Sequence, residues 1–188
     1  MDFSTAERVV PANVKSMRAA QTASEHFARG VALEEDTRSQ AEAIAAYKKV
    51  LELDPGHAAA YINLGTLYYN RQDYTRAESN YRKAVEVDPR YALAYFDLGN
   101  VLDETGRVGE AINAYKTALQ LAPTYADAHY NLALAYEKTR QPRPALQHWR
   151  AYIRLDTTGP WATHARNQIR RILESDGLKV VYRKKKQM

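Results

Sequence analysis

Three stretches, LDPGHAAAY (residues 53–61), VDPRYALAY (87–95) and LAPTYADAH (121–129), recur at a constant spacing of 34 residues. Each places an Asp-Pro or Ala-Pro turn before a run of small residues that ends in a ring. The residue before a proline is disfavoured in the α region, so this dipeptide ends one helix, and proline is tolerated at the entry to the next. A fixed period of this length predicts a stack of similar supersecondary units.

The repeat contains two apolar series at helical spacing. Tyr61, Leu64 and Tyr68 lie on one helix face, Ala77 and Tyr81 lie on a second, and the polar stretch 70–73 separates them. We number each repeat from the third residue after its proline, so that Ala58, Ala92 and Ala126 are position 1. Small residues and rings then recur at fixed positions: Gly65, Gly99 and Ala133 at position 8; Ala43, Ala77, Ala111 and Ala145 at position 20; Tyr47, Tyr81, Tyr115 and Trp149 at position 24. The small residues let two helices approach closely while the ring fills the remaining volume.

These residue types at these spacings resemble the tetratricopeptide repeat (TPR) family, and the resemblance runs from near Ala23 to Gly159. It implies an all-α fold, a right-handed superhelical solenoid of antiparallel helix pairs closed by a C-terminal capping helix. The expected segments are an N-terminal extension (1–22, partly helical or disordered), four repeats (23–57, 58–91, 92–125 and 126–159), the capping helix (160–175) and a basic tail (176–188).

The two ends of the array depart from the pattern. In the first repeat, Gly30 takes position 8 only if the corner EEDTRSQAE (34–42) holds one extra residue. In the fourth, Thr157 stands where proline is expected. Trp161 then opens the amphipathic capping segment, and we expect its ring to cover Tyr152 and Trp149.

Composition limits the function. The chain has 188 residues, no cysteine, 27 Lys+Arg and 22 Asp+Glu, for a net charge of +5. The segment 177–188 carries five of the bases and no acid, which leaves 22 bases against 22 acids before it. The chain has no apolar run near the roughly 20 residues of a spanning helix, and its first residues lack a signal-type apolar block, so a cytoplasmic location is expected.

The chain shows no motif for catalysis. Without cysteine it has no thiolate nucleophile and no cysteine-based zinc site, and its five histidines form no HxxxH or HExxH pair. His26 and His129 occupy a repeat position that takes a ring, so packing accounts for them. The sequence therefore predicts a protein that is not an enzyme and that needs no cofactor or metal.

The family resemblance implies that six positions of each first helix face a concave groove. The groove residues read from this sequence are Phe27, Ile62, Asn63, Thr66, Tyr69, Asn70, Phe96, Asp97, Asn100, Asp103, Glu104, Tyr130, Asn131, Leu134 and Glu137. Asn amides can pair with the backbone of a bound segment, apolar rings supply contact area, and a surplus of acid favours Lys or Arg in the ligand. Alternatively, the rings only complete the packing between adjacent helices. A clamp for a terminal carboxylate is not expected, because its cations are missing.

The predicted function is a non-catalytic scaffold or adaptor that binds an extended or helical, apolar-basic segment of a protein. Two alternatives rest on the basic tail, whose bases are Lys179, Arg183, Lys184, Lys185 and Lys186. The tail could contact nucleic acid or an anionic membrane. It could also dock in its own groove or in the groove of a second copy and so drive self-association. A tail that only aids solubility is the remaining alternative.

Overall fold

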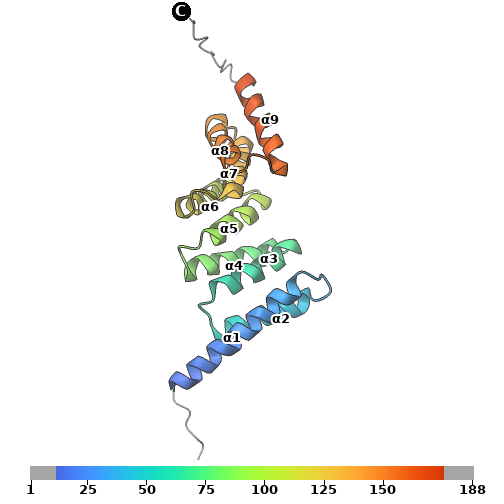
Figure 1. Cartoon of the computed structure of the whole chain (residues 1–188), viewed down its shortest axis with the longest axis vertical. Helices are drawn as coiled ribbons and strands as arrows, with labels where there is room; N and C mark the ends of the chain where they lie inside the picture. The colour runs from blue at the N-terminus through green and yellow to red at the C-terminus, as the bar shows by residue number, and fades with distance from the viewer. Residues whose placement is uncertain (1–11, 176–188) are drawn as a thin grey trace, which may run out of the picture. The chain divides into compact units, whose positions relative to one another are not determined.

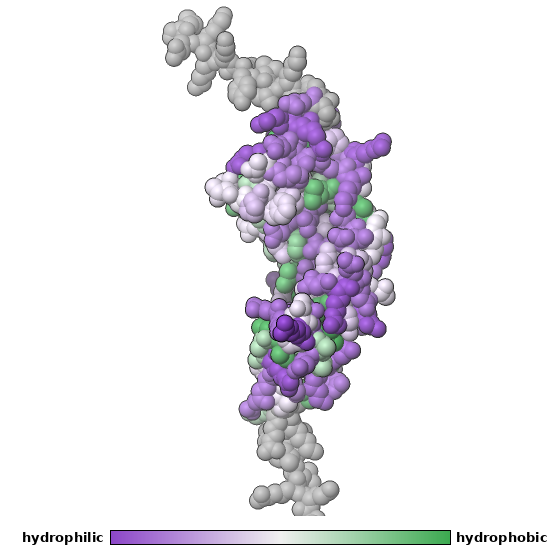
Figure 2. All heavy atoms as spheres, turned by 90° about the vertical axis from the view of Figure 1, so that its right-hand side faces the viewer, coloured by the Kyte–Doolittle hydropathy of each residue, from purple (hydrophilic) through white to green (hydrophobic). Residues whose placement is uncertain are grey.

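The computed structural model describes residues 12–175, which form nine α-helices and no strand (Figure 1). The chain divides after Pro89 into two compact units, with α1–α4 in the first and α5–α9 in the second. No helix in the described range is long and apolar enough to cross a membrane. The face drawn in Figure 2 is mostly hydrophilic, with apolar side chains gathered in separate patches.

The first unit consists of two helix pairs. The helices are α1 (Ala12–Glu34), α2 (Gln40–Leu53), α3 (Ala58–Asn70) and α4 (Tyr74–Val87). Within this unit α1 packs on α2, α2 on α3, and α3 on α4. Residues 12–22, which we assigned to an N-terminal extension that is partly helical or disordered, are helical and continue into the rest of α1 without a break.

The second unit holds two further pairs and the capping helix. Its helices are α5 (Ala92–Glu104), α6 (Val108–Leu121), α7 (Ala126–Lys138), α8 (Pro142–Leu155) and α9 (Pro160–Ser175). Each packs on the next along the chain, and α5 also meets α7. The helix bounds from α3 to α8 repeat at the 34-residue period of the sequence.

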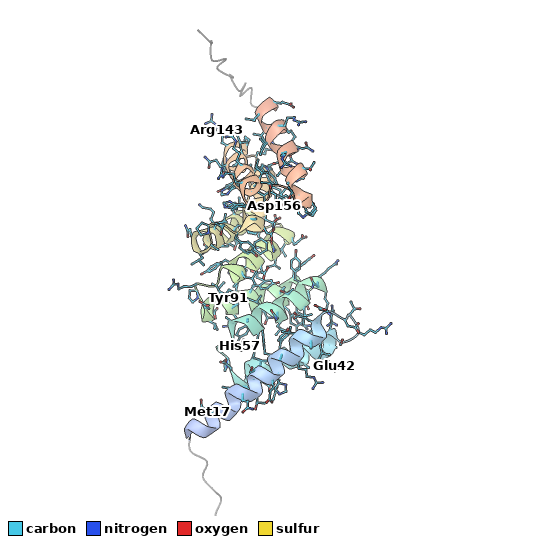
Figure 3. All side chains as sticks on the ribbon, in the orientation of Figure 1. Met17, Glu42, His57, Tyr91, Arg143 and Asp156 are labelled. Carbon is cyan, nitrogen blue, oxygen red and sulfur yellow. The ribbon has the colours of Figure 1, made fainter. Side chains whose placement is uncertain are left out.

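The end of each second helix is set by an extended residue. Asp54, Asp88 and Ala122 each precede a proline and have φ of −138°, −131° and −134°. Asp156 has φ −127° although Thr157 follows it. Its carboxylate replaces the proline constraint, because Oδ1 accepts the backbone N–H of Gly159 at 2.7 Å. Asp156 is labelled in Figure 3.

A glycine under a ring defines each of the first three helix pairs. A Cβ on Gly65 would lie 2.6 Å from Cε1 of Tyr81, and one on Gly99 would lie 2.5 Å from Cε1 of Tyr115. A Cβ on Gly30 would lie 2.6 Å from Cε1 of Tyr47. The equivalent contact confirms that Gly30 occupies position 8 of the first repeat.

The expectation for Trp161 was wrong. The ring that contacts both buried rings, Trp149 and Tyr152, belongs to Tyr130, at centroid distances of 4.9 and 5.1 Å. Trp161 instead contacts Tyr130, at a centroid distance of 5.6 Å, and stays 57% exposed. The core contacts of α9 come from Ala165 and Ile172 and their neighbours farther along the helix.

Candidate protein-binding face

The predicted groove residues lie on the first helix of each pair. In the first unit, α1 and α3 carry Phe27, Ile62, Asn63, Thr66, Tyr69 and Asn70, which we call the unit-1 face. In the second, α5 and α7 carry Phe96, Asp97, Asn100, Asp103, Glu104, Tyr130, Asn131, Leu134 and Glu137, which we call the unit-2 face. The basic tail lies outside the described residues.

The apolar members of the unit-1 face contribute mainly to packing between helices. Phe27 contacts the ring of Tyr47 at 5.6 Å and stacks on His57, at the entry to α3, at 4.7 Å. Ile62 is 3% exposed, so a ligand would reach almost none of its side chain. These contacts favour the alternative in which the apolar side chains only complete the packing between adjacent helices.

Phe96 of the unit-2 face has the same surroundings. Its ring lies 5.9 Å from Tyr115 and 4.7 Å from Tyr125, the residue before α7. Phe96 and Tyr130 are nevertheless only half-buried. His57 and Tyr125, the last residues of the first and third repeats, stand in the opening stretches, but we assigned their rings no role.

The tyrosine hydroxyls at position 24 form hydrogen bonds with side chains of these faces. In the first unit, the Tyr47 hydroxyl donates to Glu34 Oε2 at 2.5 Å and accepts from Asn63 Nδ2 at 2.9 Å. The Tyr81 hydroxyl lies 3.3 Å from Thr66 Oγ1. Each buried ring therefore fixes a polar side chain on the binding face.

In the second unit, one asparagine oxygen joins two helices. Asn100 Oδ1 accepts from the Tyr115 hydroxyl at 2.9 Å and from Asn131 Nδ2 at 2.8 Å. Within residues 12–175 the amide nitrogen of Asn100 and the amide oxygen of Asn131 have no protein hydrogen-bond partner. Asn100 can thus donate to a ligand backbone, and Asn131 can accept from it.

Two of the predicted acids already have cations. Lys138 Nζ donates to Asp103 Oδ2 at 2.6 Å, and Arg171 of α9 forms an ion pair with Glu137. Glu137 also accepts the indole N–H of Trp149 at 2.6 Å. The acid surplus inferred from the sequence is therefore smaller than expected, because partners 35 and 34 residues away neutralise these carboxylates.

Two other carboxylates of the second unit have no ion pair within the described residues. Asp97 is half-buried, and its burial raises its pKa to about 7. Asp127 is exposed in the first turn of α7. The pKa of Tyr125 is raised by burial first and then by the charges of Asp97 and Asp127, so both carboxylates lie near that hydroxyl.

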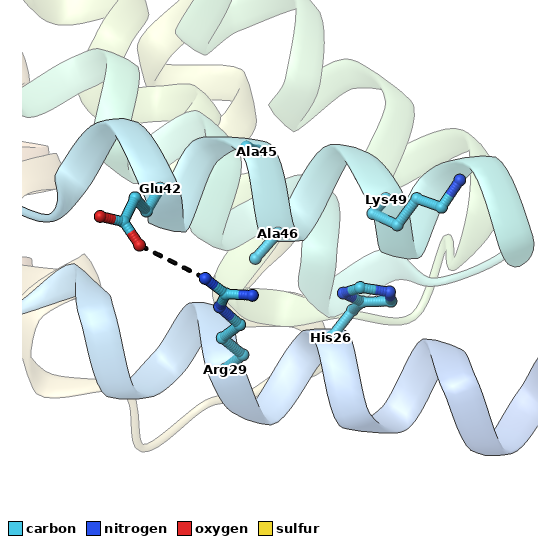
Figure 4. Close-up of a pocket in the computed structure, with 6 residues that line it drawn as sticks. All are labelled: His26, Arg29, Glu42, Ala45, Ala46 and Lys49. Carbon is cyan, nitrogen blue, oxygen red and sulfur yellow. Dashed lines mark hydrogen bonds and ion pairs between the residues drawn. The ribbon is translucent and has the colours of Figure 1, made fainter.

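Two hollows lie away from the predicted groove residues. One, of about 200 Å³, opens between α1 and α2 beside the Arg29–Glu42 ion pair (3.4 Å, Figure 4). The other, of about 220 Å³, lies between α6, α7 and α8 and includes His148. Burial lowers the pKa of His148 to about 4, helped by the nearby charges of His129 and Lys116. Across residues 12–175, no three His, Asp or Glu side chains gather to hold a metal ion.

The comparisons with known proteins agree with this arrangement. Family models for the TPR repeat match residues 65–106 and 99–139, and a model for the tetratricopeptide repeat matches residues 40–79. The chain belongs to the tetratricopeptide repeat family. No curated protein sequence matches it.

Several solved structures are similar to this TPR protein. A crystal structure of MamA is 31% identical, with a TM-score of 0.67 over 76% of this chain and 82% of that one. An O-GlcNAc transferase mutant of Thermobaculum terrenum is 28% identical, with a TM-score of 0.65; the match covers 73% of this chain but only 26% of that one. PilF of Pseudomonas aeruginosa, 23% identical, shares the fold at a TM-score of 0.73 over 86% and 72% of the chains.

Proposed function

We propose that this TPR protein is a non-catalytic scaffold or adaptor whose unit-2 face binds a segment of a partner protein. The observation that carries the proposal is the pair of open amide groups on Asn100 and Asn131. Asn100 on α5 is held by the buried Tyr115 and in turn holds Asn131 on α7, so a ligand backbone meets a donor and an acceptor already in place. Half-buried Phe96 and Tyr130 offer apolar area on the same two helices.

An extended segment suits this face better than a helix does. A helix satisfies its own backbone hydrogen bonds, whereas an extended chain leaves N–H and C=O groups to pair with the asparagine amides. The asparagines do not discriminate between side chains, so specificity comes from the rings and the unpaired carboxylates. We therefore retain the preference for an apolar-basic ligand and place its basic part near Asp97 and Asp127.

A peptide selection on the full chain tests this proposal. Peptides taken from a random library are measured against the wild type, the double variant Asn100→Ala/Asn131→Ala, and Asn113→Ala, an exposed asparagine on α6. Two lost hydrogen bonds to the ligand backbone, each of about 1 kcal/mol, predict binding weaker by about thirtyfold in the double variant. Asn113→Ala should bind as the wild type does. Failure to select any peptide, or equal binding by all three proteins, would refute the proposal.

Contact with nucleic acid is a second candidate, and a row of arginines favours it. Arg143, Arg150 and Arg154 are exposed and share one face of α8, and none has an ion-pair partner within residues 12–175. If the row contacts three phosphates of a DNA duplex, replacing all three with Gln reduces the salt dependence of binding by a slope of about 3. DNA retention that is unchanged by this variant and lost on replacing the tail lysines would assign the contact to the tail. If the wild-type protein is not retained on DNA at all, this candidate is wrong.

A further inference from the structure

A cluster of rings lies between α7, α8 and α9 of the second unit. Trp149 and Tyr152 are buried at its base. Tyr130 meets both rings edge to face, with centroids 4.9 and 5.1 Å away, and the Trp161 ring contacts Tyr130 at 5.6 Å, tilted by 57°. Trp161 is 57% exposed, although large aromatic rings are usually buried.

The Tyr130 ring, which contacts Trp161, is fixed by polar contacts. The Tyr130 hydroxyl and His164 Nδ1 share a hydrogen bond of 2.7 Å, and His164 Nε2 lies 2.7 Å from Gln168 Nε2. The Tyr130 ring is therefore anchored to α9 at its far end as well as packed on the core. Trp161 begins the same helix, next to Pro160, so its exposed ring rests on a rigid support.

A carboxylate that has no ion pair within residues 12–175 lies near these rings. Asp127 lies three residues before Tyr130 on α7, which puts both side chains on the same face of that helix. Its charge is among the causes that raise the pKa of Tyr152 to about 12, after burial and the neighbouring Asp156. Asp103 and Glu137, farther along the unit-2 face, already pair with Lys138 and Arg171, so they attract a ligand cation less strongly.

We propose that Trp161, Tyr130 and Asp127 form a site for a basic side chain, preferentially arginine, of the bound protein segment. The site deepens the proposed function and rests on it. A guanidinium stacks on the exposed face of an indole, and tryptophan is the strongest ring for this contact. The carboxylate of Asp127 neutralises the same group. An apolar side chain would cover Asp127 without pairing it, and an acidic one would meet a like charge, so both fit less well.

The two tryptophans of the chain allow a direct test by NMR. In full-length protein labelled with ¹⁵N, the indole N–H of buried Trp149, bonded to Glu137, and that of exposed Trp161 give separate signals. The probes are acetyl-Ala-Leu-Arg-Leu-Ala-amide and the same peptide with lysine, citrulline or glutamate in place of arginine. We expect saturable movement of the Trp161 signal with affinity in the order arginine, lysine, citrulline, and about fivefold between the first and the last.

Variants separate the site from its surroundings. Asp127→Asn and Trp161→Ala should each weaken the arginine peptide about threefold, whereas Trp161→Phe should retain part of the affinity. Glu174→Gln changes an exposed carboxylate on the last turn of α9 and should have no effect. Because Trp161 and Asp127 are exposed, these changes leave the core intact, and unchanged Trp149 signals verify this.

The outcomes distinguish this site from the proposed function. If the side-chain amides of Asn100 and Asn131 respond to the peptides and Trp161 does not, the binding face stands and the arginine site is wrong. Equal affinity for the arginine and citrulline peptides overturns the site in the same way. If neither the amides nor the indole responds to any peptide, both the site and the proposed function are overturned.

Discussion

Replacing Gly99 by alanine tests the packing on which the binding face depends. The added Cβ would lie 2.5 Å from Cε1 and 2.6 Å from Cδ1 of Tyr115, where ordinary contacts begin at 3.4 Å. The ring would have to move by about 1 Å, but Tyr115 is 1% exposed and its hydroxyl is bonded to Asn100. Overpacking of this kind costs about 1–3 kcal/mol, against which alanine regains at most about 1 kcal/mol of helix propensity. We expect a net loss of about 1–2 kcal/mol.

Gly109→Ala supplies a matched control in the same unit. Gly109 is exposed in α6, and a Cβ there meets nothing within 4 Å. The same chemical change should therefore stabilise the protein by about 0.5 kcal/mol through helix propensity alone. Urea unfolding followed by circular dichroism measures both variants. Their midpoints should shift in opposite directions relative to the wild type, with similar slopes.

The functional consequence follows from the same contact. A displaced Tyr115 ring withdraws its hydroxyl from Asn100 Oδ1, which loosens the amide that we propose to meet the ligand. Gly99→Ala should therefore weaken a selected peptide, and Gly109→Ala should not. If Gly99→Ala is as stable as the wild type, the close approach of ring and backbone does not hold the helix pair together, and the packing argument is wrong.

Three other changes test separate features. Arg140 has φ 57° at the corner where the preceding repeat has Gly106 at φ 78°. Arg140→Gly should therefore stabilise the protein by about 0.5–1 kcal/mol, measured by urea unfolding. A loss of stability would show that the left-handed backbone at Arg140 is not strained. Burial raises the pKa of Asp97 from 3.8 to about 7, so the native state holds the proton longer than the unfolded state does, and stability falls as pH rises between these values. Asp97→Asn should then be about 1–2 kcal/mol more stable than the wild type at pH 8 and equal to it near pH 4; equal stability at both would refute this. Burial lowers the pKa of His148 from 6.5 to about 4, so the unfolded state takes up the proton first and stability falls as pH drops from 7 to 5. After discounting for its partial exposure we expect a loss of about 1 kcal/mol, absent in His148→Gln, and identical pH profiles would contradict it.

The helical repeat could be predicted from sequence because its determinants are local. An extended residue before Pro55, Pro89 or Pro123 ends a helix whatever surrounds it, and apolar spacing defines the buried side of each helix. The contact of Gly30 with Tyr47 follows from the same pattern once the extra residue in its corner is counted. These features depend on a few neighbouring residues, and a sequence displays such neighbours directly.

Tertiary structure alone decided which groove residues stay open to a ligand. Asp103 and Lys138, or Glu137 and Arg171, meet only because two helices pack at a particular angle and bring residues about one repeat apart together. Likewise Tyr130, and not Trp161, contacts both of the last buried rings, because the start of α9 brings the indole to Tyr130 and leaves it exposed. The sequence by itself determined the helices and their buried sides through local sterics and hydrophobic period. The charge and exposure of the binding face depend on side chains meeting across helices, which only the packed structure decides.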